Sequence, residues 1–315
     1  MADAVGEFLE PDPALEHVTS LHDHLEIEIK SGHRADLRSA DERGGILTRV
    51  ADAIDRSGVG YEDQCSARHY ADVVRCIEQL QAGPVAGAAG GSSWPARWSR
   101  WRTSRRAAAT PAPAPAPATR IVDVGVFMGG TSAVFAGCAE ELGLSLDLVD
   151  TSPTYLRFTH ERLRRAFPKV AKRVRMFHGD LPTYVREVLM VETAERAVVH
   201  HDGAHEFDQV VRDLASLWFV RDRVPALAVQ DTHLRCSDLR FMCFVDAAVF
   251  AVFGPDPTYR ELGVVHEEVA PLTSPDRYFG NYCLPGVAEG MFLELAQNRF
   301  RFPHPTMPLE ALLRR

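Results

Sequence analysis

The segment "HHDGAH" at residues 200–205 places three histidines and one aspartate close together in the sequence: His200, His201, Asp202 and His205. Imidazole changes its charge near neutral pH and is also a common metal ligand. A carboxylate beside imidazole suits either proton transfer or metal binding. The segment therefore indicates a zinc site or a proton-transfer site, and the alternative is a strand end that happens to be polar.

The elements that must position this segment alternate regularly. Short apolar runs rich in β-branched residues predict strands at 120–126, 144–150, 173–180, 196–202 and 226–231. Between them, stretches with helical spacing predict helices at 131–143, 153–167 and 181–190, and one more from about Phe207. This alternation predicts an α/β fold with a doubly wound, mostly parallel sheet.

Acidic residues fall near the carboxyl ends of five of these strands: Asp123, Asp150, Asp180, Asp202 and Asp231. In doubly wound sheets ligands bind at that edge, near the point where the strand order reverses. A single aspartate after a strand is commonly a turn former or a helix cap. Five in succession on one edge predict a shared pocket.

The loop "DVGVFMGGTS" at 123–132 narrows the choice of ligand. Val126 and Phe127 separate Gly125 from the Gly129-Gly130 pair, so the dinucleotide fingerprint G-x-G-x-x-G is absent, and so is a Walker A lysine. A carboxylate can accept two hydrogen bonds from vicinal hydroxyls. Asp150 is thus a candidate for holding a ribose diol.

The motifs in this order resemble those of class I S-adenosylmethionine-dependent methyltransferases. More narrowly, they are similar to the group that contains the macrocin-type O-methyltransferases and the cephalosporin-hydroxylase-like proteins. The motifs that carry the resemblance are "DVGVFMGGTS", "GD" at 179–180, "DGAHEF" at 202–207 and "QDT" at 230–232. The resemblance covers about residues 120–235 and implies a Rossmann-like methyltransferase fold, with its final strand at 290–296.

The resemblance also implies roles for individual residues. S-adenosylmethionine would be bound by Asp123, Gly125, Gly129, Gly130, Thr131, Asp150, Asp180 and Asp202, with the ribose at Asp150 and the adenine side at Asp180. Mg²⁺ would be held by Asp202, Gln230 and Asp231. The methyl acceptor would be a hydroxyl of a small molecule: a sugar, a polyol or a phenolic compound.

Magnesium is favoured over zinc on chemical grounds as well. Successive residues of a strand point to opposite faces of the sheet, so His200 and His201 cannot both bind one ion from a regular strand. Carboxylate and amide oxygens are hard ligands that suit Mg²⁺. A site without any metal is the remaining alternative.

The chain departs from the family pattern at two positions. Many relatives carry an acid at the position of Ala204, and the pair Gln230-Asp231 replaces two acids. We therefore expect His205 to act as the base together with Asp202, unless catalysis is impaired. The alternative functions are a cephalosporin-hydroxylase-like protein of unsettled reaction and a non-catalytic ligand-binding or scaffold protein.

The rest of the chain divides into three segments around the α/β domain at 120–300. Residues 1–82 predict an N-terminal helical region whose apolar stripes pack on a neighbouring domain or subunit, which allows a homo-oligomer. Residues 83–119 predict a Gly-rich, Trp/Arg and Pro-Ala linker, and 301–315 a C-terminal tail. Tryptophans alternating with arginines in the linker could stack on single-stranded nucleic acid, but a solvated insertion is favoured.

Composition limits the partners and the compartment. A formal net charge of −8 argues against a general nucleic-acid or anionic-membrane binder. The apolar run 241–254 is too short to cross a bilayer, which predicts no membrane span. The acidic start lacks a signal pattern, and the six cysteines form no regular framework. These features predict a cytoplasmic protein with reduced thiols.

Overall fold

The computed structural model describes residues 6–28, 34–41, 44–59, 65–83, 117–236, 243–271 and 282–302. Most of the predicted linker, including its Trp/Arg stretch, lies outside the described residues. Most of the predicted C-terminal tail does so as well. The described end of that linker segment is part of the fold: Ala118 is buried, and Thr119 donates through Oγ1 to Glu195 at 2.6 Å.

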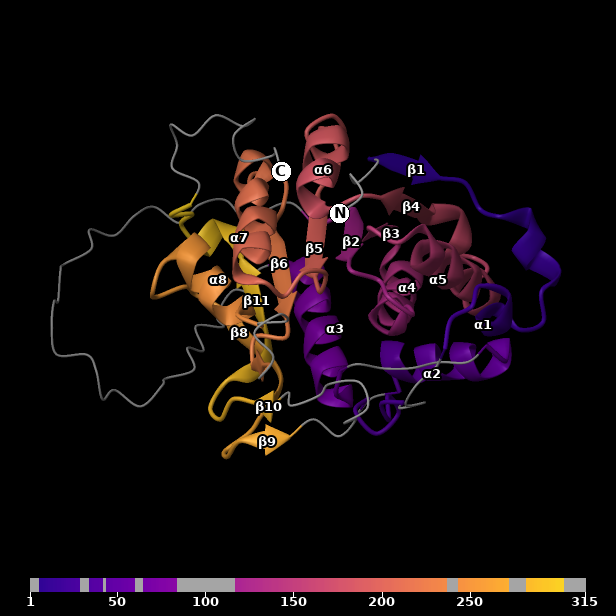
Figure 1. Ribbon diagram of the computed structural model, residues 1–315, viewed down its shortest axis with the longest axis horizontal. Helices are drawn as coiled ribbons and strands as arrows, with labels where there is room; N and C mark the ends of the chain where they lie inside the picture. Colours follow the sequence, from indigo (N-terminus) through magenta and orange to yellow (C-terminus); the bar gives the residue numbers. More distant parts are fainter. Residues whose placement is uncertain are drawn as a thin grey trace, which may run out of the picture.

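The centre of the molecule is an eight-stranded mixed sheet in the order β1-β4-β3-β2-β5-β6-β11-β8 (Figure 1). The strands between β4 and β6 are parallel, whereas β1, β11 and β8 pair antiparallel with their neighbours. A three-stranded sheet, β7-β10-β9, lies beside it. The strands are β1 (Glu7–Leu9), β2 (Arg120–Val124), β3 (Ser145–Asp150), β4 (Val174–His178), β5 (Ala197–His201), β6 (Ala226–Gln230), β7 (Leu234–Arg235), β8 (Arg260–Val265), β9 (Ala270–Pro271), β10 (Tyr282–Cys283) and β11 (Ala288–Glu294). The predicted doubly wound, mostly parallel sheet is confirmed.

Helices cover both faces of the sheet (Figure 1). The α-helices are α1 (Leu21–His24), α2 (Ile46–Ser57), α3 (Ala67–Ala82), α4 (Gly130–Leu142), α5 (Pro153–Ala166), α6 (Leu181–Tyr184), α7 (Phe207–Ser216) and α8 (Val245–Phe253). Short 3-10 turns η1 (Pro13–His17), η2 (Ala171–Arg173), η4 (Leu217–Val220) and η6 (Leu295–Gln297), and a π-helical segment η3 (Val185–Leu189), complete the set. One core lies between the sheet and α2 to α5, and a second lies between the sheet and α6 to α8.

The segment before α2 differs from the helix that its stripe predicts. Leu15 lies in η1 and Leu21 begins α1, and the stripe is interrupted because Ser20 caps a new helix start by accepting from Asp23 N. The side chains still pack together against Met128 and Phe158. Ahead of them, β1 joins the edge of the sheet beside β4, which the sequence pattern did not indicate.

The N-terminal helices α2 and α3 pack on the α/β domain itself. Gly137 of α4 allows α2 and α4 to approach closely, because a Cβ at this position would lie 2.3 Å from Cγ2 of Val50 in α2. Ser66 caps α3 by accepting from His69 N at 3.1 Å, and α3 then lies across β11 and β8. The N-terminal region and the sheet therefore share one hydrophobic core.

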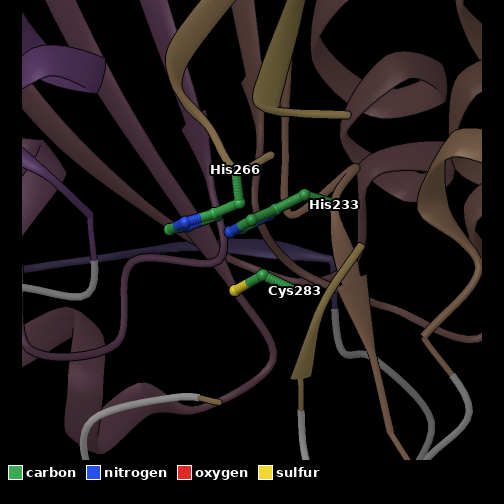
Figure 2. A group of neighbouring side chains, drawn as sticks. All are labelled: His233, His266 and Cys283. Carbon is green, nitrogen blue, oxygen red and sulfur yellow. The ribbon is translucent and has the colours of Figure 1, made fainter. Parts of the chain in front are cut away.

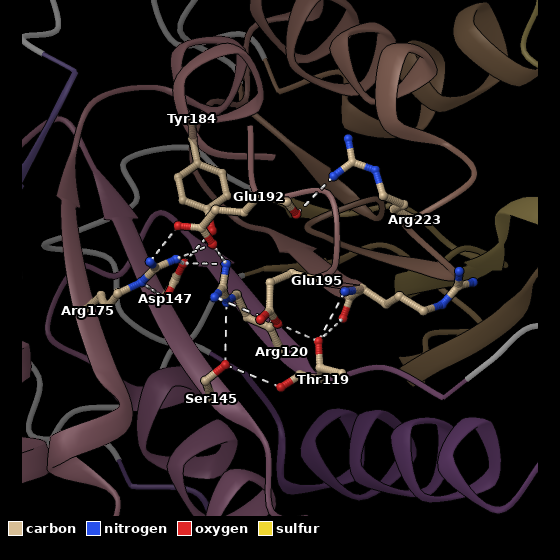
Figure 3. Close-up of polar contacts among 10 residues, drawn as sticks. Thr119, Arg120, Ser145, Asp147, Arg175, Tyr184, Glu192, Glu195 and Arg223 are labelled. Carbon is tan, nitrogen blue, oxygen red and sulfur yellow. Dashed lines mark hydrogen bonds and ion pairs between the residues drawn. The ribbon is translucent and has the colours of Figure 1, made fainter. Parts of the chain in front are cut away.

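Charged side chains tie together the amino ends of the central strands, at the edge opposite the predicted pocket (Figure 3). Asp147 of β3 is fully buried and binds Arg175 of β4, with Nη2 and Oδ2 2.6 Å apart, and lies 3.5 Å from Arg120 of β2. Glu192 pairs with both arginines. Each buried charge has a partner, as burial in a low-dielectric interior requires.

In the part of the chain that the structure describes, no helix combines the length and the apolar composition that crossing a membrane requires.

Candidate active site

A glycine loop follows β2 at the point where the strand order reverses, between β2 and β5. Gly125 and Gly129 have φ values of 84° and 75°, and Phe127 between them has a φ of 42°. A Cβ on Gly125 would lie 2.2 Å from the carbonyl oxygen of Asp202, so the backbone after β2 touches the backbone after β5. Only glycine fits this conformation and this approach. Gly130 then begins α4.

Asp150 holds the glycine loop from the end of β3. Its Oδ2 accepts hydrogen bonds from Val126 N at 2.9 Å and from Phe127 N at 3.4 Å, and its Oδ1 accepts from Ser152 N at 2.8 Å. Burial raises the pKa of this carboxyl group, although these backbone donors oppose the shift. Asp150 thus shapes the loop in addition to any contact with a bound ribose.

The other predicted donor-binding residues lie in different surroundings. Asp180 follows β4, is nearly buried, and caps α6 by accepting from Thr183 N at 3.0 Å. Thr131 lies in the first turn of α4, with Oγ1 4.0 Å from Sγ of Cys65. Asp123 is inside β2 rather than at its end and is fully buried.

Asp123 binds neighbours of the same core. Its Oδ2 accepts from Ser132 Oγ at 2.5 Å, and its Oδ1 lies 2.8 Å from Nδ1 of His200. Burial lowers the pKa of His200, but Asp123 outweighs this effect and raises it. Gln230, which is also buried, contributes to the rise. These contacts form a buried polar row beside the ends of β2, β5 and β6.

Asp202, His205 and Asp231 meet at the carboxyl edge of β5 and β6. Nε2 of His205 lies 3.2 Å from Oδ2 of Asp231 and 3.7 Å from Oδ1 of Asp202. Asp231 has a φ of 61°, a left-handed conformation that costs energy for a residue other than glycine and is common at functional sites. The structure thus brings together two predicted metal ligands and the predicted base.

The electrostatics of this cluster follow from its burial and its charges. Burial raises the pKa of Asp202 to about 6, with Asp231 adding to the shift and His205 opposing it. Burial lowers the pKa of His205, but hydrogen bonds and charges from Asp202, Cys243 and Asp231 outweigh it and raise that pKa well above its ordinary value. In the free protein the proton is therefore favoured on His205, whose single positive charge offsets part of the negative charge of Asp202 and Asp231.

The two strand histidines lie on opposite faces of the sheet, as strand geometry requires. The His200 ring contacts Phe135 of α4, whereas Nε2 of His201 lies 2.9 Å from Oδ2 of Asp213 in α7. Both rings are almost completely buried. One zinc ion bound by both is therefore excluded by this geometry.

The donor set of the edge cluster fits a hard divalent cation. Asp202, His205 and Asp231 each offer one ligand atom, and these atoms lie within 4.8 Å of one another. Mg²⁺ is commonly held by one or two carboxylates, with waters and substrate oxygens in its other positions. Asp202 and Asp231 meet that requirement, while Gln230 lies in the buried row, where its side chain helps to raise the pKa of His200.

Two further segments reach the site that the motifs did not point to. Cys65, just before α3, is buried, and its pKa is raised by burial and by Asp202, Asp231 and Glu289. Cys243, just before α8, places Sγ 4.0 Å from Nδ1 of His205. Neither position has a sequence signal, because each reaches the site through the packing of a helix far away in the chain.

Comparisons with known proteins agree with this arrangement. The family model described as "Methyltransferase domain" matches residues 122–228. This range begins in β2 and ends in β6, so it spans the glycine loop and Asp202. No curated protein matches the sequence.

Solved structures of methyltransferases are similar at a low level. One is an O-methyltransferase from Bacillus cereus in complex with S-adenosylhomocysteine, 11% identical, with 82% of this chain and 94% of that chain covered and a TM-score of 0.40. Another is an O-methyltransferase from Streptomyces achromogenes involved in tomaymycin synthesis, in complex with S-adenosylmethionine, 13% identical, with 59% and 65% covered and a TM-score of 0.33. At these values the similarities carry no further conclusion.

The family match, the order of the motifs and the sheet topology agree on one assignment. The macrocin-type subgroup is not singled out by the match. Residues 122–228 therefore match a methyltransferase domain, and they form the parallel centre of the sheet.

Proposed function

We propose that this protein transfers a methyl group from S-adenosylmethionine to a hydroxyl of a small molecule, with His205 as the base. The convergence of Asp202, His205 and Asp231 beside the glycine loop carries the proposal. A donor held by the loop would present its methyl group next to these side chains. The C–O bond forms as the C–S bond breaks, S-adenosylhomocysteine leaves, and the hydroxyl proton passes to His205 Nε2.

Asp202 and Asp231 contact His205 in the free protein and would bind the cation when it is present. The cation and His205 would then have different tasks. Mg²⁺ held by Asp202 and Asp231 would orient the acceptor hydroxyl and make it more acidic. His205 would then lose the interactions with Asp202 and Asp231 that raise its pKa, which would favour a neutral ring able to accept a proton. The methyl donor is already activated by its sulfonium charge, so alignment and proton removal are the main tasks left to the protein.

The first experiment is a screen of sugars, polyols and phenols for donor-dependent turnover, with and without Mg²⁺. We expect His205→Ala to lower turnover by about 10²–10⁴-fold, the usual effect of losing a general base, while donor and metal binding stay nearly intact. Asp202→Asn should abolish both the Mg²⁺ dependence and most of the turnover, with little loss of donor affinity.

Other histidines serve as controls. His24→Ala, at an exposed position of α1, should be fully active. Full activity of His205→Ala together with an inactive but folded His200→Ala or His201→Ala would show that the base is assigned to the wrong residue. Donor binding without turnover of any hydroxyl compound would favour the non-catalytic ligand-binding alternative.

A further inference from the structure

A second cluster of metal-binding side chains lies outside the proposed catalytic residues. His233, His266 and Cys283 each offer one ligand atom, and these three atoms lie within 4.8 Å of one another. Figure 2 shows the three side chains extending in the same direction from three separate segments of backbone. Two imidazoles and a thiol are the borderline and soft ligands that zinc prefers, whereas Mg²⁺ prefers oxygen.

The backbone around these residues fixes their mutual position. Cys283 belongs to β10, which pairs antiparallel with β7 directly after His233. His233 O accepts from Leu284 N at 2.8 Å, and His266 O, just after β8, accepts from Gly286 N at 2.7 Å. The three ligand residues are therefore held by strand pairing and hydrogen bonds, not by the side chains alone.

The side chains themselves leave a binding position unused. His233 and Cys283 are 6% and 3% exposed, respectively, so most of the cluster is shielded from water. Nδ1 of His233 is buried and meets no hydrogen-bond partner within the described part of the chain. A buried polar atom without a partner is costly, and a bound cation would satisfy it. The His233 and His266 rings are nearly parallel, 8° apart, and Figure 2 shows the Cys283 side chain next to them.

The spacing allows a tetrahedral ion after a small adjustment. Zn–N bonds of about 2.0–2.1 Å and Zn–S bonds of about 2.3 Å place tetrahedral ligand atoms roughly 3.3–3.7 Å apart. Ligand atoms within 4.8 Å need to close by about 1.5 Å at most, which side-chain rotation can supply. From this geometry we propose that His233, His266 and Cys283 form a zinc-binding site, with the fourth position open to water or another ligand.

This site is independent of the proposed magnesium ligands, although it is close to them. His233 follows Asp231 by two residues, on the segment that leaves β6. Asp231 belongs to the group with Asp202 and His205, whereas His233 belongs to the group with His266 and Cys283. Zinc at His233, His266 and Cys283 would fasten the β7-β10 pair to the end of β8 beside the catalytic edge.

The test is a zinc titration of the full-length protein after its metals have been removed with a chelator, against a chromophoric competitor. We expect one equivalent of zinc, with affinity lowered about tenfold or more in Cys283→Ser and His233→Gln. Asp202→Asn should keep that affinity. Cys236→Ser and Cys243→Ser are matched controls, because neither cysteine belongs to the cluster and neither forms a disulfide within the described residues.

Cobalt gives a second measurement that does not depend on the folding of any variant. Co²⁺ added to the unmutated protein should produce a thiolate-to-metal absorption band, which zinc should displace and which should persist in Cys236→Ser and Cys243→Ser. Absence of both zinc binding and the band would overturn the proposal. Loss of the band in Cys243→Ser, or of zinc in Asp202→Asn, would instead assign the ion to the His205 cluster.

Discussion

Asp150 holds the glycine loop and is also the residue expected to bind the ribose of the donor. Asp150→Ala should weaken binding of S-adenosylmethionine by about tenfold or more, because charge-assisted hydrogen bonds of this kind contribute about 1.5–3 kcal/mol. Its contacts with Val126 N and Phe127 N are lost as well, so the loop should also become less ordered. Calorimetry on the parent and the variant measures the change.

The control for this prediction is Asp222→Ala, an exposed aspartate before β6 at the opposite edge of the sheet. It should bind the donor as the parent does. A parent protein that binds no donor, or that prefers a nicotinamide dinucleotide, would contradict the assignment of the loop.

At this scale the sequence predicts which residues approach the site, but not which way each side chain points. Asp202 and Asp231 meet His205, as their positions at strand ends suggested. Asp123 turns inward to Ser132 and His200, because it lies within β2 and its direction follows from strand alternation. The proximity of Cys65 has no local signal at all, since it depends on where α3 packs.

At the scale of elements, the contact between the ends of β2 and β5 depends on Gly125. Gly125→Ala should prevent that contact, because the new Cβ would meet backbone atoms of Asp202 and Gly203 at 2.2–2.5 Å, in addition to the strain of a positive φ. We expect the free energy of unfolding to fall by about 3 kcal/mol, as when a core is overpacked. Donor binding should also be lost.

Gly143→Ala is the matched control for Gly125→Ala. Gly143 has a φ of 71°, but nothing lies within 4 Å of a Cβ placed there. It should cost only about 1 kcal/mol, the strain of the left-handed conformation, and leave donor binding unchanged. Urea denaturation of both variants gives the comparison, and equal costs would show that the close approach to Asp202 is unimportant.

The packing of α3 on the sheet predicts a dependence of stability on pH. His69 of α3 is fully buried, and burial, with the charges of His200 and His233, lowers its pKa to about 3. The unfolded chain binds this proton near pH 6.5, so the folded state loses stability as the pH falls from about 6.5 toward 3. At pH 5 the loss attributable to His69 should be about 2 kcal/mol.

The comparison of His69→Phe with the parent isolates this contribution. The difference in unfolding free energy between pH 7 and pH 5, measured with urea, should be smaller in the variant by roughly that amount. His17→Phe, at an exposed position in η1, should behave as the parent does. An unchanged pH dependence in His69→Phe would show that other groups cause the acid-side loss.

For the whole molecule, periodicity predicts the sheet well because each strand of the parallel centre is buried on both faces and each helix presents one apolar stripe. β1 escapes such prediction, because three residues at a sheet edge carry too little pattern. The cluster of His233, His266 and Cys283 cannot be predicted from the pattern either. These residues are separated in sequence and come together through the pairing of β7 with β10 and the hydrogen bond from Gly286 N to His266 O.

The segment between α3 and β2 provides the last prediction. Nε2 of Gln81 donates to Ala118 O at 3.0 Å, so the described residues on either side of residues 84–116 are already adjacent in space. Replacing 84–116 with a short Gly-Ser linker therefore needs no strain, and a shorter loop lowers the entropy cost of closure. We expect a nearly unchanged melting temperature and unchanged donor binding.

The replacement must leave residues 117–119 in place, because Ala118 is buried and Thr119 binds Glu195 and Arg196. A fall of many degrees would show that the tryptophans between 84 and 116 pack on the domain, and a loss of nucleic-acid affinity would restore the stacking function for the Trp/Arg stretch.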